Sequence, residues 1–228
     1  MRKIGKLLVL IICITVMIIT GYKIYDYMFG EENDFSEIRS GGVDLNALHK
    51  NNKDIVGWIK IDGTRIDYPV MQRKGSPEFY LRKNFKKQYS ESGTPFLQYD
   101  SKIGKSKNYL IYGHNMKTGY MFHDLLKYKE HKFYKKHKII HFETLKEGKC
   151  DYEVISAFKT ETYNFNYSNF GKIIDDKTYS KYMGIIKSLN GIKTNKKAQY
   201  PHQLITLATC SYHVDDHCGR FLVVGRKI

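Results

Sequence analysis

The longest apolar run of the chain lies at its N-terminus. Arg2, Lys3 and Lys6 precede sixteen uncharged, mostly apolar residues that end before Lys23. As a helix this run is roughly 24 Å long, somewhat less than a hydrocarbon core of about 30 Å, and the flanking lysines can extend outward to close the difference. No small-residue cleavage site follows the run. The pattern therefore predicts an uncleaved signal anchor over residues 1–25, with its basic end inside and the rest outside.

The remaining chain alternates short apolar segments with turn residues. Residues 26–40 are mostly polar and are predicted to form a linker, and residues 41–228 to form one folded domain. Asp62-Gly63 predicts a turn between the first two strands of this domain. The segments with the apolar content of strands are WIKI, IDYPV, TPFLQY, NYLIYGH, KIIHFET, CDYEVISAFKT, HQLITLAT and RFLVVGRKI.

Other segments have the spacing of helices. Asp44 is a suitable N-cap for a short helix in DLNALHKNN, and EFYLRKNF predicts a helical turn or loop. Apolar residues in YMFHDLLKYKEHKFYKKH fall on one helical face. DDKTYSKYMGIIKSLNG predicts a longer helix that is capped by Asp175 or Asp176 and stopped by Gly191. Because no βαβ rhythm is present, the pattern favours a mostly antiparallel closed sheet or barrel with helices in its connections.

The charge of the chain favours an anionic neighbour. The formal net charge is +15. Between Lys102 and Lys149, twelve lysines face four acidic residues, a local surplus of eight. These lysines are spread through the segment without an arginine-rich recognition helix, so no nucleic-acid partner is expected. A basic domain that binds an anionic polymer without chemistry is one alternative that this composition leaves open.

A cluster near the C-terminus raises the question of metal binding. In CSYHVDDHC, the residues Cys210, His213, His217 and Cys218 are ligand types that zinc accepts. Structural zinc sites usually combine a short cysteine pair with a second, separated pair, whereas here all four residues lie within nine positions. We therefore expect no metal, with an extracytoplasmic zinc-binding module as the alternative. The spacing also leaves open whether Cys210 and Cys218 form a disulfide.

Cys210 has the surroundings expected of a nucleophile. It follows the apolar run LITLAT and begins a polar loop, a position that is rigid and accessible. Arg220 begins the next strand, so two adjacent antiparallel strands would bring it beside the thiol, where it can stabilise negative charge. His114 also follows a strand, after YLIYG, and is favoured over His123 and His213 as general acid and base.

These residues resemble the pattern of a sortase, a cysteine transpeptidase of Gram-positive cell surfaces. TLATC is followed ten residues later by arginine, and YGH lies about a hundred residues upstream of the cysteine. DIVGWIKIDGTRIDYPVMQ, NYLIYGHNM and HKIIHFET are also similar to sortase segments. The predicted N-terminal helices and the long helix before the cysteine strand are similar to class B. The resemblance implies a mostly β fold, a closed barrel of about eight strands with helical insertions.

The resemblance also implies roles for individual residues. Cys210 would be the nucleophile, His114 the general acid and base, and Arg220 the group that stabilises the substrate and the oxyanion. No acidic residue can be assigned to orient His114. Class B enzymes often have serine two residues before the cysteine, where this chain has Ala208. The family's sorting-signal groove implies four substrate contacts, Leu81, Thr162, Tyr167 and Thr209.

The implied activity needs no cofactor. The enzyme would cleave an LPxTG-like or NPxTG-like signal, between Thr and Gly, near the C-terminus of a secreted protein. A peptidoglycan-precursor amine would then resolve the cysteine thioester and link the protein to the wall. The expected location is the cell membrane, with a single span and the catalytic domain on the extracytoplasmic face.

Overall fold

The structure, a computed structural model, describes residues 2–25, 31–189, 191–192, 194–214 and 218–228. The chain divides into two compact units, Met1–Val43 and Asp44–Ile228. The first contains helix α1 (Arg2–Tyr25) and helix α2 (Glu31–Ser40). Within α1, Ile4–Tyr25 has 22 residues and a mean hydropathy of 2.5, and it has the length and apolar composition needed to cross a membrane.

Helix α2 occupies residues 31–40 of the segment that the sequence predicts as a linker, and residues 26–30 lie outside the described part of the chain. Phe35 of α2 is buried, with 2% of its surface exposed. One buried aromatic side chain among polar residues gives no clear helical period along the sequence, so polar composition alone does not distinguish a linker from a short helix.

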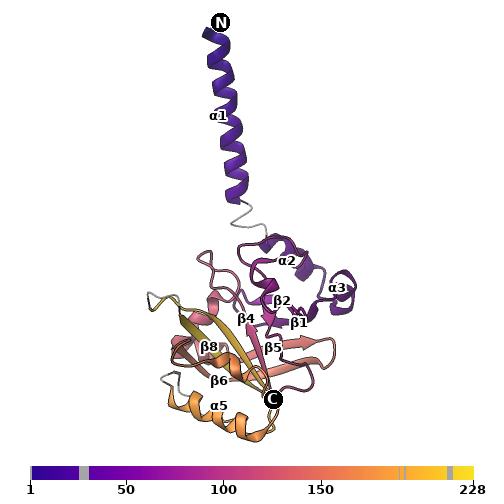
Figure 1. The fold of residues 1–228 in the computed structure, drawn as a ribbon, viewed down its shortest axis with the longest axis vertical. Coiled ribbons are helices and arrows are strands. Elements are labelled where there is room, and N and C mark those ends of the chain that lie inside the picture. Colours follow the sequence, from indigo (N-terminus) through magenta and orange to yellow (C-terminus); the bar gives the residue numbers. More distant parts are fainter. Residues whose placement is uncertain (1, 26–30, 190, 193, 215–217) are drawn as a thin grey trace. The chain divides into compact units, whose positions relative to one another are not determined.

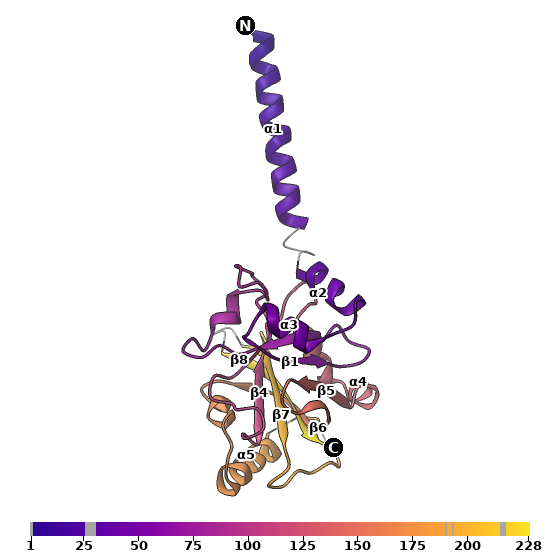
Figure 2. The same ribbon diagram turned by 90° about the vertical axis from the view of Figure 1, so that its right-hand side faces the viewer.

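Eight strands of the second unit close into a barrel in the order β1-β2-β3-β4-β7-β8-β6-β5 (Figure 1, Figure 2). The predicted closed barrel is confirmed. Six of the eight predicted strand segments match closely. WIKI covers only the second half of its strand, and TPFLQY contributes only a two-residue strand. The strands are β1 (Ile55–Lys60), β2 (Asp67–Met71), β3 (Phe96–Leu97), β4 (Asn108–Tyr112), β5 (Ile139–Thr144), β6 (Gly148–Glu161), β7 (Leu204–Cys210) and β8 (Gly219–Lys227).

The barrel is mixed rather than purely antiparallel. β2 pairs with β3, and β4 with β7, in parallel, whereas the other neighbouring strands are antiparallel. A parallel pair needs a long crossover, and the segment between β4 and β7 is long enough to provide one. The parallel β4–β7 pair matters for the site because it directs the C-terminal ends of both strands to the same rim.

The long helix α5 (Asp176–Ser188) packs on the outside of the barrel. The sequence predicts Asp175 or Asp176 as its N-cap. Asp175 is the cap, and its carboxylate accepts a hydrogen bond from the backbone N–H of Thr178. Tyr179, Tyr182 and Ile186 are buried against β4, β6, β7 and β8, so these strands are covered on both faces. This explains why β7 reads as a continuous apolar run instead of an alternating one.

Five shorter helices lie in the described part of the second unit. Asp44 accepts hydrogen bonds from the backbone N–H groups of Asn46 and Ala47, which confirms the predicted cap. The bounds are α3 (Leu45–Asn51), α4 (His131–Lys136) and the 3₁₀ helices η2 (Phe79–Arg82), η3 (His123–Lys129) and η4 (Tyr167–Phe170).

The single helix predicted in YMFHDLLKYKEHKFYKKH is wrong, because this segment forms η3 and then α4. Glu130 between them has extended backbone angles. The carboxylate of Asp124 in η3 is buried and accepts a hydrogen bond from the backbone N–H of Arg65. Apolar spacing along the chain cannot show such a tertiary contact.

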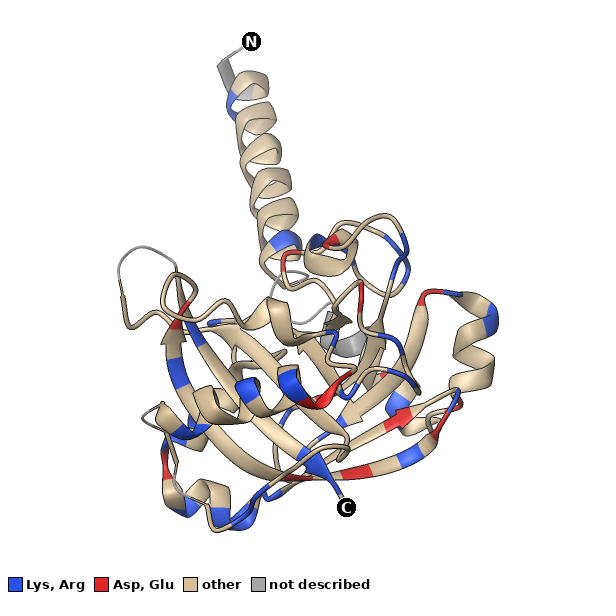
Figure 3. Ribbon diagram, turned by 60° about the horizontal axis from the view of Figure 1, so that its bottom comes forward, with Lys and Arg blue, Asp and Glu red and all other residues tan. Residues whose placement is uncertain are grey.

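Basic residues are distributed over helices, strands and loops of the second unit and are interspersed with acidic ones (Figure 3). Several surface lysines pair with carboxylates, among them Lys127 with Asp124 and Lys196 with Glu153. The excess of positive charge is therefore a property of the whole unit rather than of one element.

Candidate active site

Three strands end at one rim of the barrel, and each brings a candidate residue. β4 and β7 pair in parallel up to Tyr112 and Ala208, so His114 and Cys210, two residues further on, emerge at the same end. In the antiparallel β7–β8 pair, Cys210 lies directly opposite Arg220. Directly opposite residues project from the same face of a sheet, so the thiol and the guanidinium point to the same side. The predicted juxtaposition of Cys210 and Arg220 is thus present.

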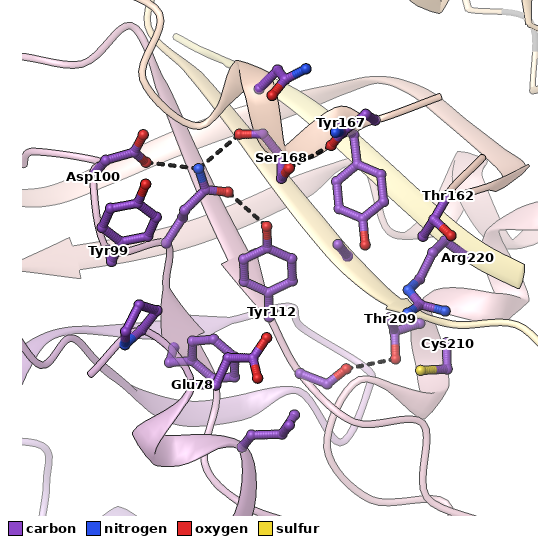
Figure 4. Close-up of a pocket in the computed structure, with 18 of the residues that line it drawn as sticks. Glu78, Tyr99, Asp100, Tyr112, Thr162, Tyr167, Ser168, Thr209, Cys210 and Arg220 are labelled. Atoms are coloured by element: carbon purple, nitrogen blue, oxygen red, sulfur yellow. Dashed lines mark hydrogen bonds between the residues drawn. The ribbon is translucent and has the colours of Figure 1, made fainter. Parts of the chain in front are cut away.

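This rim opens into a cavity of about 670 Å³. Figure 4 shows Cys210 and Arg220 at one end, Tyr99 and Asp100 at the other, and Tyr112 between them. The structure brings all seven site residues expected from the sequence to the wall of this cavity: Leu81, His114, Thr162, Tyr167, Thr209, Cys210 and Arg220.

His114 follows a glycine that the packing requires. A Cβ at Gly113 would lie 2.6 Å from Cγ of Phe122, so only glycine fits between this ring and β7. The backbone of Gly113 bonds to β7 on both sides: its N–H donates to the Ala208 carbonyl, and its carbonyl accepts from Thr209 Oγ1 at 2.7 Å. The strand end that carries His114 is thereby attached to the strand that carries Cys210.

The ring of His114 is oriented by a backbone carbonyl. Its Nε2 lies 2.8 Å from the carbonyl oxygen of Leu81 in η2. Because a carbonyl only accepts, Nε2 must carry the proton of this bond. The acidic partner that sequence reasoning could not assign is therefore unnecessary for orientation.

The electrostatic surroundings of His114 oppose its protonation. Burial lowers the pKa of the imidazole below its ordinary value. The Leu81 carbonyl acts in the opposite direction and raises it, the cation of Arg82 lowers it, and the carboxylate of Glu91 raises it. The net result is a lowered pKa, so the neutral form of His114 predominates at neutral pH.

Arg220 is held by two neighbours. Its Nη1 donates to the carbonyl of Gly219 at 2.9 Å, and the Tyr167 hydroxyl is within hydrogen-bonding reach of the guanidinium. Burial lowers the pKa of Arg220, but the nearby Tyr167 and Cys210 more than offset this, so the net pKa is raised. Arginine is therefore a fixed positive charge at this rim.

The four predicted substrate contacts differ in what they touch. Thr209 is buried and its hydroxyl is engaged with Gly113, so it joins two strands as well as lining the cavity. Leu81 contributes its carbonyl to His114. Thr162 directly follows β6, and its N–H donates to the Cys218 carbonyl. Tyr167 is buried in η4, with burial raising its pKa and keeping the phenol neutral.

Sequence reasoning missed the polar network at the far end of the cavity. Gln98 is buried, and its Nε2 donates to Asp100 Oδ1 and to the Ser168 carbonyl, both at 2.7 Å. Its Oε1 accepts from the Tyr112 hydroxyl at 2.6 Å, which fixes that ring in the wall (Figure 4). The only signal was the end of TPFLQY, where a polar residue follows an apolar run. Such a pattern is too common to identify a site.

The other histidines considered from the sequence have different partners. His123 Nδ1 lies 2.8 Å from Asn115 Oδ1. His213 Nε2 lies 2.9 Å from Glu161 Oε1, and its Nδ1 lies 3.0 Å from Ser211 Oγ. Of the predicted zinc ligands, His217 lies outside the described residues. Among the residues that are described, no group of three or more His, Cys, Asp or Glu could hold a metal ion. Cys210 and Cys218, both among the described residues, are not joined by a disulfide in this structure.

Comparison with known proteins agrees with this geometry. The sequence pattern of the sortase domain matches residues 59–228. This chain belongs to the sortase family. Sortase B of Staphylococcus aureus is 30% identical to this sortase, over 97% of this chain and 96% of that protein. Sortase B of Listeria monocytogenes is 35% identical, over 81% of this chain and 74% of that protein.

Solved structures of sortase B are similar to this chain in fold as well. The Clostridium perfringens sortase B structure has a TM-score of 0.74 and 28% identity, and covers 81% of this chain and 100% of that one. A Staphylococcus aureus sortase B–substrate complex has a TM-score of 0.74 and 29% identity, covering 92% of this chain and 97% of that one. The resemblance to class B is therefore confirmed. Sortases are cysteine transpeptidases, and this sortase is a cell-wall sorting transpeptidase of that kind.

Proposed function

We propose that this sortase is anchored in the membrane and cleaves a C-terminal sorting signal, LPxTG-like or NPxTG-like, between Thr and Gly. It then transfers the secreted protein to a peptidoglycan amine. One observation carries the assignment of the reactive residues: Cys210 and Arg220 lie opposite each other in register and line one cavity with His114. The similarity to a Staphylococcus aureus sortase B that was solved with its substrate supports a sorting-signal substrate.

In the first half of the reaction, the thiol proton of Cys210 passes to Nδ1 of neutral His114, and the resulting thiolate attacks the carbonyl carbon of the signal's Thr. Negative charge then develops on that carbonyl oxygen, and the fixed cation of Arg220 lies beside the thiol, where it stabilises this charge. When the C–N bond of the Thr–Gly peptide breaks, the leaving nitrogen takes a proton from His114. The products are a Cys210 thioester and a free amino-terminal Gly.

The hydrogen bond to Leu81 indicates which proton of His114 moves. Nε2–H is engaged with the Leu81 carbonyl. In the imidazolium form, Nδ1 carries the second proton, and this is the one available to the leaving amine. In the second half, the wall-precursor amine attacks the thioester carbon and loses a proton to Nδ1, and the Cys210 thiolate departs. The Nδ1 proton then returns to the thiolate, so the two halves together restore the starting protonation state.

The test is the reaction of the full chain, in detergent micelles, with a panel of LPxTG-like and NPxTG-like peptides. We expect cleavage between Thr and Gly, and a mass increase on Cys210 equal to the acyl part of the peptide. Cys210→Ala should abolish both while remaining folded, whereas the matched control Cys218→Ser should retain most activity. Turnover in Cys210→Ala would refute the proposal. Equal loss in Cys218→Ser, together with bound zinc, would favour the zinc-binding module.

The proposed anchor is α1. Its apolar residues Ile4–Tyr25 have side chains exposed throughout, as expected of a segment that lipid surrounds. With basic residues at its N-terminus, the positive-inside rule places residues 26–228 outside. Protease treatment of intact cells should therefore digest the catalytic unit, and carbonate washing should leave the chain in the membrane fraction. Protection from protease in intact cells would show the opposite orientation.

A further inference from the structure

The backbone pairing of β4 and β7 stops just before Cys210. The register ends at Tyr112 and Ala208, with one additional hydrogen bond from the Gly113 N–H to the Ala208 carbonyl at 3.1 Å. Beyond this point the chain of β4 turns away toward η3. The carbonyl of Cys210 therefore has no backbone donor from β4.

A side chain takes the place of the missing strand. Asn115 Nδ2 donates to the Cys210 carbonyl at 3.0 Å. This amide comes from the residue directly after His114, and it is buried, with 8% of its surface exposed. Buried carbonyl groups are costly to leave without a donor, so this bond holds the backbone of Cys210 in position.

The other end of the Asn115 amide is held by His123. Asn115 Oδ1 lies 2.8 Å from His123 Nδ1. Chemistry fixes the direction of both bonds. The Cys210 carbonyl can only accept, so the amide nitrogen faces it and the amide oxygen faces His123, whose Nδ1 must then carry a proton. Nδ1 carries that proton in both the neutral tautomer and the imidazolium, so protonation of His123 leaves the link intact.

The backbone around these residues brings His123 back to Asn115. Asn115 forms an antiparallel bridge with Met121, and the N–H of Met121 donates to the buried Tyr68 hydroxyl at 3.1 Å. Met121 has a φ of 56°, in the left-handed region that few residues other than glycine adopt. The N–H of Phe122 donates to the carbonyl of His114 at 2.9 Å. The general acid and the Asn115 link thus share one small, tightly bonded loop.

We propose that Asn115 is a positioning residue of this transpeptidase, that it holds the backbone of Cys210 opposite Arg220, and that His123 orients its amide. The inference rests on the proposed function, in which Cys210 is the nucleophile. It assigns a role to His123, which is distinct from that of His114 and does not depend on the charge of the ring. Since a misplacement of about 1 Å can cost on the order of 10²-fold in rate, a displaced Cys210 reacts slowly even in a folded protein.

The decisive variant is Asn115→Asp in the full chain in detergent micelles. Aspartate has the same shape and still accepts from His123, but it offers the Cys210 carbonyl a repelling oxygen instead of a donor. We expect kcat to fall by more than about tenfold with KM nearly unchanged, because an interaction that matters only for the reacting geometry lowers kcat. The rate at which iodoacetamide alkylates Cys210, followed by peptide mapping, should change as well.

His123 supplies the matched pair of variants. His123→Phe removes the donor, whereas His123→Gln retains a side-chain N–H. We expect a fall in kcat for the first and substantial rescue by the second. Since His123 acts through Asn115, the double variant Asn115→Ala/His123→Phe should be no slower than Asn115→Ala alone.

A purely structural link would give a different set of results. Wild-type kcat per folded molecule in Asn115→Asp, counted by thiol titration, would overturn the proposal, as would additive losses in the double variant. If Asn115→Asp does not fold, the kcat values of His123→Phe and His123→Gln decide: equal kcat values in the two variants would overturn the proposal. If the wild-type chain cleaves no peptide, the proposed function fails, and the alkylation rate of Cys210 still tests the positioning role.

Discussion

The cavity is lined by two kinds of element that are built in different ways. His114, Cys210 and Arg220 lie at the ends of β4, β7 and β8, where backbone pairing sets their positions. Their neighbours Leu81 and Tyr167 lie on the short 3₁₀ helices η2 and η4, which are placed by side-chain packing and single hydrogen bonds.

The strand ends carry the residues proposed for the chemical steps, and the 3₁₀ helices carry residues proposed for substrate recognition. Sheet register fixes a residue through many cooperative hydrogen bonds, which suits groups that must keep a reacting geometry. A 3₁₀ turn has weaker hydrogen-bond geometry and depends on its neighbours, so its residues can change without moving the barrel. We therefore expect large kinetic effects from changes at the strand ends and small, tuning effects from changes in η2.

The largest effects are expected for His114→Ala and Arg220→Lys. Each should reduce kcat by on the order of 10²-fold or more, because one removes the proposed general acid and the other replaces a planar guanidinium fork by a point charge. Steady-state cleavage of a sorting peptide measures this. Arg226→Lys is the matched control, since Arg226 lies on β8 but bonds to Glu153 and Lys197, not to residues of the cavity. Full activity in Arg220→Lys would show that charge alone is sufficient.

An intermediate effect is expected for Gly113→Ala. The added Cβ would lie 2.6 Å from the ring of Phe122, so the ring and the strand end with His114 must shift. We expect a loss of kcat of about tenfold and a lower Tm, because this strand end carries His114, the proposed general acid. Gly184→Ala is the control: a Cβ there meets no heavy atom within 4 Å, and alanine in α5 should stabilise the fold by ~0.5–1 kcal/mol without changing kcat. Equal activity of both variants would contradict the comparison.

The smallest effect is expected for Arg82→Gln in η2. The Arg82 cation opposes protonation of His114, so its removal should raise the His114 pKa and increase the protonated fraction at neutral pH. Glu91→Gln should lower that pKa, and the double variant should lie near wild type, because Arg82 and Glu91 also pair with each other. Both groups are exposed to solvent, which screens their charges and keeps each shift of the His114 pKa small. NMR titration of the His114 ring measures it, and a shift of the opposite sign would refute this arrangement.

The sequence predicted the elements of the barrel well where local chemistry is strong. The turn at Asp62-Gly63, the caps at Asp44 and Asp175 and the closed barrel are confirmed. Spacing along β7 and β8 was also sufficient to predict that Cys210 and Arg220 meet, because an antiparallel pair joined by one loop has few registers. The single helix predicted across η3 and α4 was wrong, because the segment forms a 3₁₀ helix and a short α-helix with Glu130 extended between them.

Local pattern thus determined which residues end strands and which side chains carry chemistry, because propensity, capping and alternation act over a few positions. Tertiary structure alone decided which other groups, backbone or side chain, hold these reactive side chains in place. The carbonyl of Leu81 orients His114 from 33 residues away, and Asn115 reaches Cys210 across 95 residues. Such bonds depend on closure of the barrel and on the parallel β4–β7 pair. No property of a short segment encodes them.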